Sequence, residues 1–203
     1  MSRLRPTIAL AALIAVIASC AAAAGVMDPE AGDMAMGSAK ARVTVIEYAS
    51  VGCPHCAAWS HDVFPTVKAR YIDTGRVRFV MREMITGDAT IATAGFMVAR
   101  CAAPEKYFAV VDQVYSHQAQ MWGKAANAGA VLGDIAKSVG MSEADFEACI
   151  DDQKGLDALN ARVALHNKDG VESTPTFFVD GKRYDEPLTL AQVAEAVHGG
   201  HRP

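Results

Sequence analysis

The sequence predicts an α/β protein with a central mixed β-sheet and an all-helical insertion. A strand-like run at 43–48, a helical pattern at 57–72 and a second strand-like run at 77–84 form a βαβ unit, which implies a parallel pair of strands. Residues 88–150 show helical patterns and no strand signal. Near the end, Asp180-Gly181 divides two short strand-like runs, as in a type I′ hairpin. An antiparallel hairpin added to a parallel pair makes the sheet mixed.

The first 20 residues have the features of an export signal. Arg3 and Arg5 precede an apolar stretch at 7–19, which is too short to cross a bilayer. Two cleavage sites remain open. Cys20 completes a lipobox-like sequence and would then carry a lipid, whereas Ala22-Ala23-Ala24 fits ordinary cleavage. Both predict an exported, periplasmic protein, and the first adds a membrane anchor.

Residues 21–41 are rich in Ala, Gly, Asp and Met and show no periodicity, so we expect a flexible linker. The folded domain is then expected over 42–198. The chain of 203 residues has a net charge of −4 and no long basic patch, which argues against nucleic-acid binding.

The first strand of the domain contains an unusual carboxylate. Glu47 interrupts a nearly continuous β-branched run at 43–48, six residues before Cys53. It could be a solvated glutamate facing an edge, or a buried acid that exchanges protons with Cys56 during thiol chemistry. Its place at the end of a strand that leads into a cysteine motif favours the second interpretation. In the helical stretch that follows, Pro65 should produce a kink.

The motif Cys53-Pro54-His55-Cys56 is the strongest chemical signal in the chain. Positions i and i+3 of a first helical turn face the same way, so the two thiols can form a disulfide. Pro54 suits the first helical position, which places Cys53 at the helix N-terminus, where exposed N–H groups favour a thiolate. A protonated His55 would add a positive charge beside the sulfur.

Two further cysteines, Cys101 and Cys149, lie in the helical region. They could be separate small core residues or a disulfide that staples the insertion. With Cys20 set aside, an even number of cysteines in an exported protein favours pairing. The same region contains Ser142 and Asp145, spaced as in a helix capping box.

Taken together, these features resemble the DsbA-like branch of the thioredoxin superfamily, the exported bacterial thiol:disulfide oxidoreductases. The likeness covers about 42–198 and implies a thioredoxin-like fold around the insertion. It depends on the Cys53–Cys56 motif after a strand, Glu47 six residues earlier, the helical insertion, and Thr174-Pro175 before the last hairpin. The chain departs from the pattern at 82–86, which lacks the proline expected from relatives.

The resemblance also implies roles for individual residues. Cys53 would form the mixed disulfide with the substrate, and the buried Cys56 would resolve it. Pro175 would be cis and lie against the disulfide, and Thr174 would contact the substrate backbone. A Pro-His dipeptide between the cysteines goes with an oxidising site in this family.

We therefore expect a disulfide donor that acts on reduced or unfolded exported proteins and is reoxidised by a membrane partner. No cofactor or metal is expected, and the lack of room for a dimerisation domain predicts a monomer. A reductase or isomerase is the main alternative, and a copper-handling module is a weaker one. Haem attachment is excluded because Ala57, not His, follows Cys56. A zinc site would need two more ligands.

Overall fold

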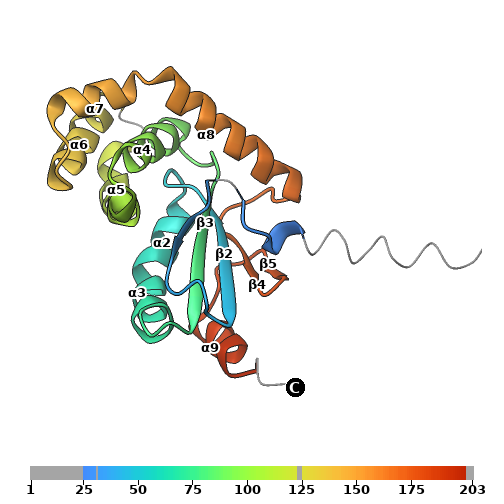
Figure 1. The fold of residues 1–203 in the computed structure, drawn as a ribbon. Coiled ribbons are helices and arrows are strands. Elements are labelled where there is room, and N and C mark those ends of the chain that lie inside the picture. Colours follow the sequence, from blue (N-terminus) through green and yellow to red (C-terminus); the bar gives the residue numbers. More distant parts are fainter. Residues whose placement is uncertain (1–24, 31, 123–124, 200–203) are drawn as a thin grey trace, which may run out of the picture.

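The computed structural model describes residues 25–30, 32–122 and 125–199. Within these residues, five strands form one sheet in the order β1-β3-β2-β4-β5 (Figure 1). β2 and β3 are parallel, whereas the other neighbouring pairs are antiparallel. The predicted mixed sheet with a parallel central pair is therefore confirmed. The strands are β1 (Met34–Met36), β2 (Val43–Ala49), β3 (Val77–Glu83), β4 (Thr176–Val179) and β5 (Lys182–Tyr184).

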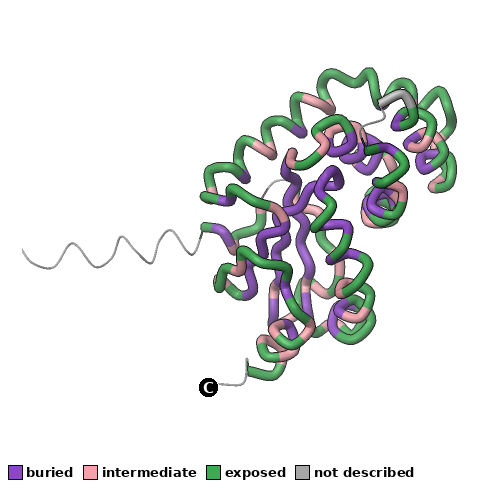
Figure 2. The backbone as a smooth tube through the Cα atoms, turned by 180° about the vertical axis from the view of Figure 1, so that it is seen from behind, coloured by how far each residue is buried: buried purple, intermediate pink, exposed green. Residues whose placement is uncertain are grey.

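The two central strands form the buried middle of the molecule. β2 and β3 each have one half-buried residue, their second, and all other positions are buried (Figure 2). Strands buried on both faces need mostly apolar side chains on both, which explains the nearly continuous β-branched run of β2. The turn between β4 and β5 has positive φ angles at Asp180 (47°) and Gly181 (87°), as a type I′ hairpin requires.

The helical stretch expected at 57–72 is divided into three pieces. α2 (Pro54–Asp62) ends before Val63, α3 (Phe64–Val67) has Pro65 in its first turn, and a π-helical turn (Lys68–Ile72) follows. Proline has no N–H to donate and is tolerated only where a helix begins. The break therefore comes at Val63, two residues before Pro65, rather than as a kink within one helix. α9 (Leu190–Gly199) closes the domain.

The insertion lies between β3 and β4 in the chain, and its helices gather at one end of the sheet (Figure 1). The last of them returns from the insertion toward the sheet and leads into a 3₁₀ turn (Asn167–Asp169). Ser142 accepts a hydrogen bond from the Asp145 N–H at 3.1 Å, so the predicted helix cap is confirmed. The helices are α4 (Ala89–Cys101), α5 (Tyr107–Met121), α6 (Ala125–Ser138), α7 (Glu143–Ile150) and α8 (Gln153–His166), with a 3₁₀ turn (Pro104–Lys106) before α5.

Two sets of contacts fix the insertion. Cys101 of α4 and Cys149 of α7 form a disulfide that closes a sequence separation of 48. At the end of β3, the fully buried Glu83 binds Arg100 of α4 at 2.6 Å and Arg162 of α8 at 2.7 Å. Tyr107 of α5 donates a third hydrogen bond to the same carboxylate at 3.0 Å. One glutamate thus ties three insertion helices to the end of β3.

The expectation of a flexible linker at 21–41 is wrong for the described part of that segment. β1 pairs antiparallel with β3 and extends the sheet, and Val26 is buried. The domain therefore begins before residue 42. The composition of the segment concealed this because its stability comes from partners elsewhere in the chain. The segment 1–20 and Cys20 lie outside the described residues.

The main partner of this N-terminal segment is Arg82, whose side chain is completely buried. Its guanidinium binds Glu30 at 2.7 Å and Asp33 at 3.1 Å. It also donates hydrogen bonds to the carbonyl oxygens of Val26 and Asp28, each at 2.8 Å. A buried guanidinium is stable only when its charge and its donors are satisfied, and the segment supplies these partners.

Candidate active site

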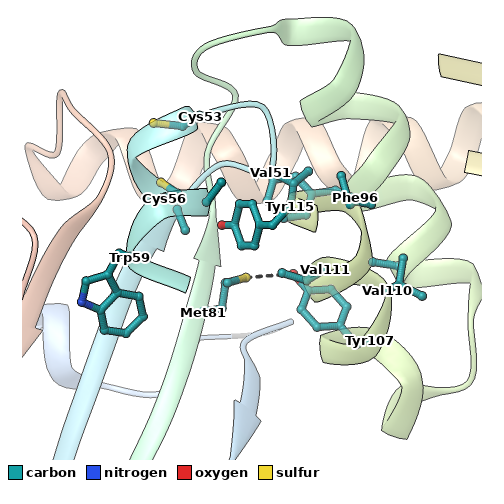
Figure 3. Packing of buried hydrophobic residues seen from close by; sticks show 14 of the residues in the cluster. Val51, Cys53, Cys56, Trp59, Met81, Phe96, Tyr107, Val110, Val111 and Tyr115 are labelled. Atoms are coloured by element: carbon teal, nitrogen blue, oxygen red, sulfur yellow. Dashed lines mark hydrogen bonds between the residues drawn. The ribbon is translucent and has the colours of Figure 1, made fainter. Parts of the chain in front are cut away.

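The two motif cysteines lie at the start of α2, on the side of the domain that faces the insertion (Figure 3). Cys53 is the N-cap residue and Pro54 occupies the first turn, as predicted. Both cysteines are free thiols, so the structure shows the reduced form. The Cys53 side chain is nearly covered, whereas Cys56 is completely buried.

The thiol of Cys53 is strongly acidified. A hydrogen bond from Cys56 is the largest cause that lowers its pKa to about 5, against the opposing effect of burial. A side-chain hydrogen bond from Thr174 and the backbone N–H groups of Cys56 and His55 lower it further. The imidazole of His55 is exposed, and His55 lowers the pKa of Cys53 through its backbone N–H. The helix N-terminus therefore stabilises a thiolate at Cys53.

The second thiol has the opposite character. Burial raises the pKa of Cys56 well above its ordinary value, and its hydrogen bond to Cys53 and the charge of Glu47 raise it further. Near neutral pH the reduced site thus holds a thiolate at Cys53 and a thiol at Cys56. The two sulfurs share one hydrogen bond, with Cys56 as the donor.

Glu47 lies inside the core on β2 and is only 2% exposed, which rules out a solvated edge position. Burial, and then the charge of Cys53, raises the pKa of Glu47 to about 8. Its Oε1 atom has no hydrogen-bond partner among the described residues, and the same is true of the hydroxyl of Tyr115. Both residues line one cavity of about 20 Å³, which is large enough for a water molecule.

Figure 3 shows the Tyr115 hydroxyl on the side of α5 that faces Cys56. Tyr115 is also buried, and the charges of Cys56 and Glu47 contribute to raising its pKa after burial itself. The carboxyl group of Glu47 and the phenol of Tyr115 therefore line one small, largely apolar cavity, and both interact electrostatically with the resolving thiol.

The cis-proline loop forms the wall opposite Cys53. The Thr174–Pro175 peptide bond is cis, and Pro175 is buried. The Cys53 sulfur lies 3.3 Å from the carbonyl oxygen of Thr174, to which it donates a hydrogen bond when it is protonated. The structure thus brings together Cys53, Cys56, Glu47, Thr174 and Pro175, which the sequence places in three separate segments.

A second loop at the site was missed from the sequence. The loop after β3 packs directly on the residue before Cys53, and the Asp88 N–H donates to the Gly52 carbonyl at 3.0 Å. A Cβ atom at Gly52 would lie 2.2 Å from the Asp88 carbonyl oxygen, and one at Gly87 would lie 2.0 Å from the Gly52 carbonyl oxygen. Gly87 also has a φ of +70°. Both contacts therefore require glycine.

The same loop reaches the cis-proline loop through Thr86. Ser50 donates from its hydroxyl to the Thr86 carbonyl at 2.8 Å, which fixes the backbone of the loop. The Thr86 hydroxyl lies 2.5 Å from the Thr174 hydroxyl. Sequence patterns carried no signal for Thr86, because its role depends on the meeting of two loops 88 positions apart.

One group of potential metal ligands occurs in the part of the chain that the structure describes. Glu30, Asp33 and His166 offer ligand atoms within 4.8 Å of one another. Arg82 already pairs with both of these carboxylates, so a cation there would meet a buried positive charge. This cluster belongs to the N-terminal segment rather than to the cysteine site.

Comparison with known proteins gives one family. Residues 30–198 match the family model described as Thioredoxin. A Rickettsia typhi protein whose name places it among the protein-disulfide oxidoreductases is 31% identical over 166 residues, which are 81% of this chain and 60% of that protein. This chain therefore spans less than two thirds of that relative.

A solved structure, alpha-DsbA1 from Wolbachia pipientis, superposes with a TM-score of 0.76 at 26% identity. The match covers 86% of this chain and 94% of that one. BdbD from Bacillus subtilis in its oxidised form gives a TM-score of 0.73 at 21% identity, over 83% and 92% of the two chains, which supports the fold alone. The thioredoxin-like fold with a helical insertion is thereby confirmed.

Proposed function

The chain belongs to the thioredoxin family, in its DsbA-like branch, and from this premise we propose that it donates disulfides to reduced proteins through Cys53 and Cys56. One observation carries the proposal. The two thiols differ in acidity, with the pKa of Cys53 lowered to about 5 and that of Cys56 raised well above its ordinary value. A stabilised thiolate favours the reduced form of the site, so the Cys53–Cys56 disulfide is readily transferred to substrate thiols.

In the first step a substrate thiolate attacks the sulfur of Cys53. The bond between Cys53 and Cys56 breaks, a mixed disulfide forms, and Cys56 leaves with the electron pair. Because Cys56 is buried and its thiolate is disfavoured there, it must receive a proton as it leaves. Glu47 is the proposed donor, since its raised pKa keeps it protonated near neutral pH.

In the second step another substrate thiolate attacks the substrate sulfur of the mixed disulfide. Cys53 leaves as a thiolate, the substrate gains a disulfide, and the protein holds the two electrons as a dithiol. A thiol of low pKa is a good leaving group, so the acidity of Cys53 speeds this release. The carbonyl oxygen of Thr174 beside Cys53 is placed to accept a backbone N–H of the substrate.

The charge on Cys53 raises the pKa of Glu47 only in the reduced site, because Cys53 is uncharged in both the enzyme disulfide and the mixed disulfide. Burial, the larger cause, acts in every state and keeps the pKa of Glu47 raised, so Glu47 can hold the proton that Cys56 receives when the enzyme disulfide opens. In the reverse reaction the same carboxylate takes the proton back from Cys56, which allows Cys56 to resolve the mixed disulfide.

The proposed setting is the periplasm. The basic n-region and apolar stretch at the start of the chain support export, and the disulfide between Cys101 and Cys149 suits an oxidising compartment. No helix within the described residues combines the length and apolar character needed to cross a membrane. The proposed partners are reduced exported proteins and a membrane protein that reoxidises the site. A lipid on Cys20 would hold the enzyme near that membrane protein.

A donation assay tests the proposed function. The oxidised protein is mixed with a reduced, unfolded peptide that contains two cysteines, and peptide thiols are counted over time. The wild type should consume two thiols per enzyme, and Cys53→Ser should consume none. The matched control is the variant with Cys101→Ala and Cys149→Ala, which should still donate. Equal donation by Cys53→Ser would overturn the proposed site.

A further inference from the structure

Two threonine hydroxyls lead from the loop after β3 to the reactive sulfur. The Thr86 hydroxyl lies 2.5 Å from the Thr174 hydroxyl. Thr174 in turn lies against Cys53, with its carbonyl oxygen 3.3 Å from the sulfur, and a hydrogen bond from its side chain lowers the pKa of Cys53. Both threonines are half-buried, so water competes only partly for these contacts. The chain of contacts runs from Thr86 through Thr174 to Cys53.

The number of available hydroxyl hydrogens determines which group donates at each contact in this series of hydrogen bonds. A threonine hydroxyl has a single hydrogen to donate, and a thiolate can only accept. When Cys53 is a thiolate, Thr174 must point its hydrogen at the sulfur. The short contact between the two hydroxyls then requires Thr86 to be the donor and Thr174 the acceptor.

We propose that Thr86 is a positioning residue that stabilises the Cys53 thiolate through Thr174 and thereby makes the active-site disulfide more oxidising. By donating to Thr174, Thr86 orients that hydroxyl toward the sulfur and polarises it, because hydrogen bonds in series strengthen one another. A stronger hydrogen bond to the charged form favours the thiolate. When the disulfide forms, the charge is gone and Thr174 is free to turn its hydrogen elsewhere.

Backbone contacts fix the position of Thr86, and they do not involve its side chain. The Ser50 hydroxyl donates to the carbonyl oxygen of Thr86 at 2.8 Å. The backbone N–H of Thr86 donates to the Ser50 hydroxyl oxygen at 3.3 Å. The close packing of Gly87 and Asp88 against Gly52 fixes the loop beside the residue that precedes the motif. A substitution that removes only the Thr86 hydroxyl should therefore leave the backbone in place.

Other groups face Cys53 and must stay constant in a test. Cys56 and the backbone N–H groups of α2 act from the helix, Glu47 acts from β2, and Thr174 acts from the cis-proline loop. Tyr115 of α5 lies within reach of the Cys53 charge. Thr86 has no charge of its own, so its removal changes the hydrogen-bond chain without altering the net charge of the site.

The test is a double-mutant cycle on the full-length protein. Thr86→Val, Thr174→Val and the double variant are equilibrated with glutathione, and thiolate absorbance is titrated against pH. Thr86→Val should raise the pKa of Cys53. It should also lower the equilibrium constant for oxidation of glutathione about three- to tenfold, where tenfold corresponds to 29.6 mV. Thr86→Ser should restore both values, and Thr90→Val, which alters an exposed threonine of α4, should change neither.

The cycle separates action through Thr174 from a general effect on the loop. In the Thr174→Val background, Thr86→Val should have little further effect on either quantity. An equal effect in both backgrounds, or no effect of Thr86→Val in the wild type, would overturn the inference. The inference rests on the proposed function, but it fails separately. A wild type that does not oxidise glutathione refutes the proposed function. A wild type that oxidises glutathione, together with a Thr86→Val variant of the same pKa and equilibrium constant, refutes only the role of Thr86.

Discussion

The sulfur of Cys53 lies 3.3 Å from the carbonyl oxygen of Thr174, although 121 positions separate the two residues in the chain. This contact places the Cys53 sulfur against the backbone acceptor that we propose for the substrate. A substrate cysteine that reaches Cys53 therefore passes beside the cis-proline loop. The geometry gives the two cysteines unequal access, because Cys53 is 6% exposed whereas Cys56 is completely buried.

The unequal access predicts which cysteine captures substrates. Cys56→Ser removes the thiol that resolves mixed disulfides, so complexes joined through Cys53 should accumulate. Non-reducing electrophoresis followed by mass spectrometry identifies the cysteine that is joined. Cys53→Ser is the matched control and should capture none. Complexes that form in Cys53→Ser and are absent from Cys56→Ser would show that the two roles are reversed.

Glu47 should make the stability of the reduced protein depend on pH. In the folded protein its pKa is raised to about 8, so it keeps a proton that the unfolded chain releases above about pH 4.5. Its contribution to stability is therefore fully present at low pH and is lost as pH rises toward 8. Glu47→Gln cannot release this proton. Relative to the wild type, the free energy of unfolding of the variant should rise by about 1.4 kcal/mol per pH unit between pH 5 and 8.

Urea denaturation of both proteins, kept reduced, measures this difference at each pH. The acidic Cys53 contributes an opposite slope in both proteins, so it largely cancels when they are compared. Glu47→Gln should also slow the resolution of mixed disulfides by Cys56 and flatten the pH dependence of that rate. A constant stability difference across the range, with an unaltered rate profile, would contradict a proton-exchanging role.

The general plan of the fold could be predicted from the sequence because it is determined locally. The β-branched run of β2, the strand-like pattern of β3, the Asp180-Gly181 turn and the Ser142 cap each specify their own element, and the structure contains all of them. The Cys53 N-cap could be predicted in the same way, since proline at the next position leaves few alternatives.

The parts that could not be predicted depend on partners far away in the chain. The segment around Glu30 packs on the domain through the buried Arg82 and the pairing of β1 with β3, and Thr86 reaches the site because two loops meet there. A charged residue inside an apolar strand was the available signal for Arg82. For Thr86 there was none, because a threonine in a loop is unremarkable until its hydroxyl has a neighbour.

The buried guanidinium should contribute strongly to stability. Arg82→Met leaves the carboxylates of Glu30 and Asp33 without their partner, so we expect a loss of about 3–5 kcal/mol in the free energy of unfolding. Residues 25–36 should also become more sensitive to proteases. Lys68→Met is the control, because its pair with Asp73 is exposed and should contribute less than about 1 kcal/mol. Equal losses in the two variants would contradict the anchoring role of Arg82.

The disulfide of the insertion should act on stability and not on redox chemistry. It closes a separation of 48 residues, for which the chain-entropy model gives about 4 kcal/mol. Cys101→Ala with Cys149→Ala should lower the free energy of unfolding by up to this amount, as measured by chemical denaturation. The reduction potential of the Cys53–Cys56 pair should stay the same. A marked change in that potential would mean that the Cys101–Cys149 disulfide also affects the active site.

The oxidising character of the site is the central claim, and equilibration of the Cys53–Cys56 pair with glutathione tests it most directly. The fraction of reduced protein is measured by thiol alkylation at a series of ratios of reduced to oxidised glutathione. The low pKa of Cys53 predicts a potential clearly more oxidising than the glutathione pool, with the protein largely reduced where glutathione is mostly oxidised. A potential as reducing as that of thioredoxin, about −270 mV, would contradict the claim.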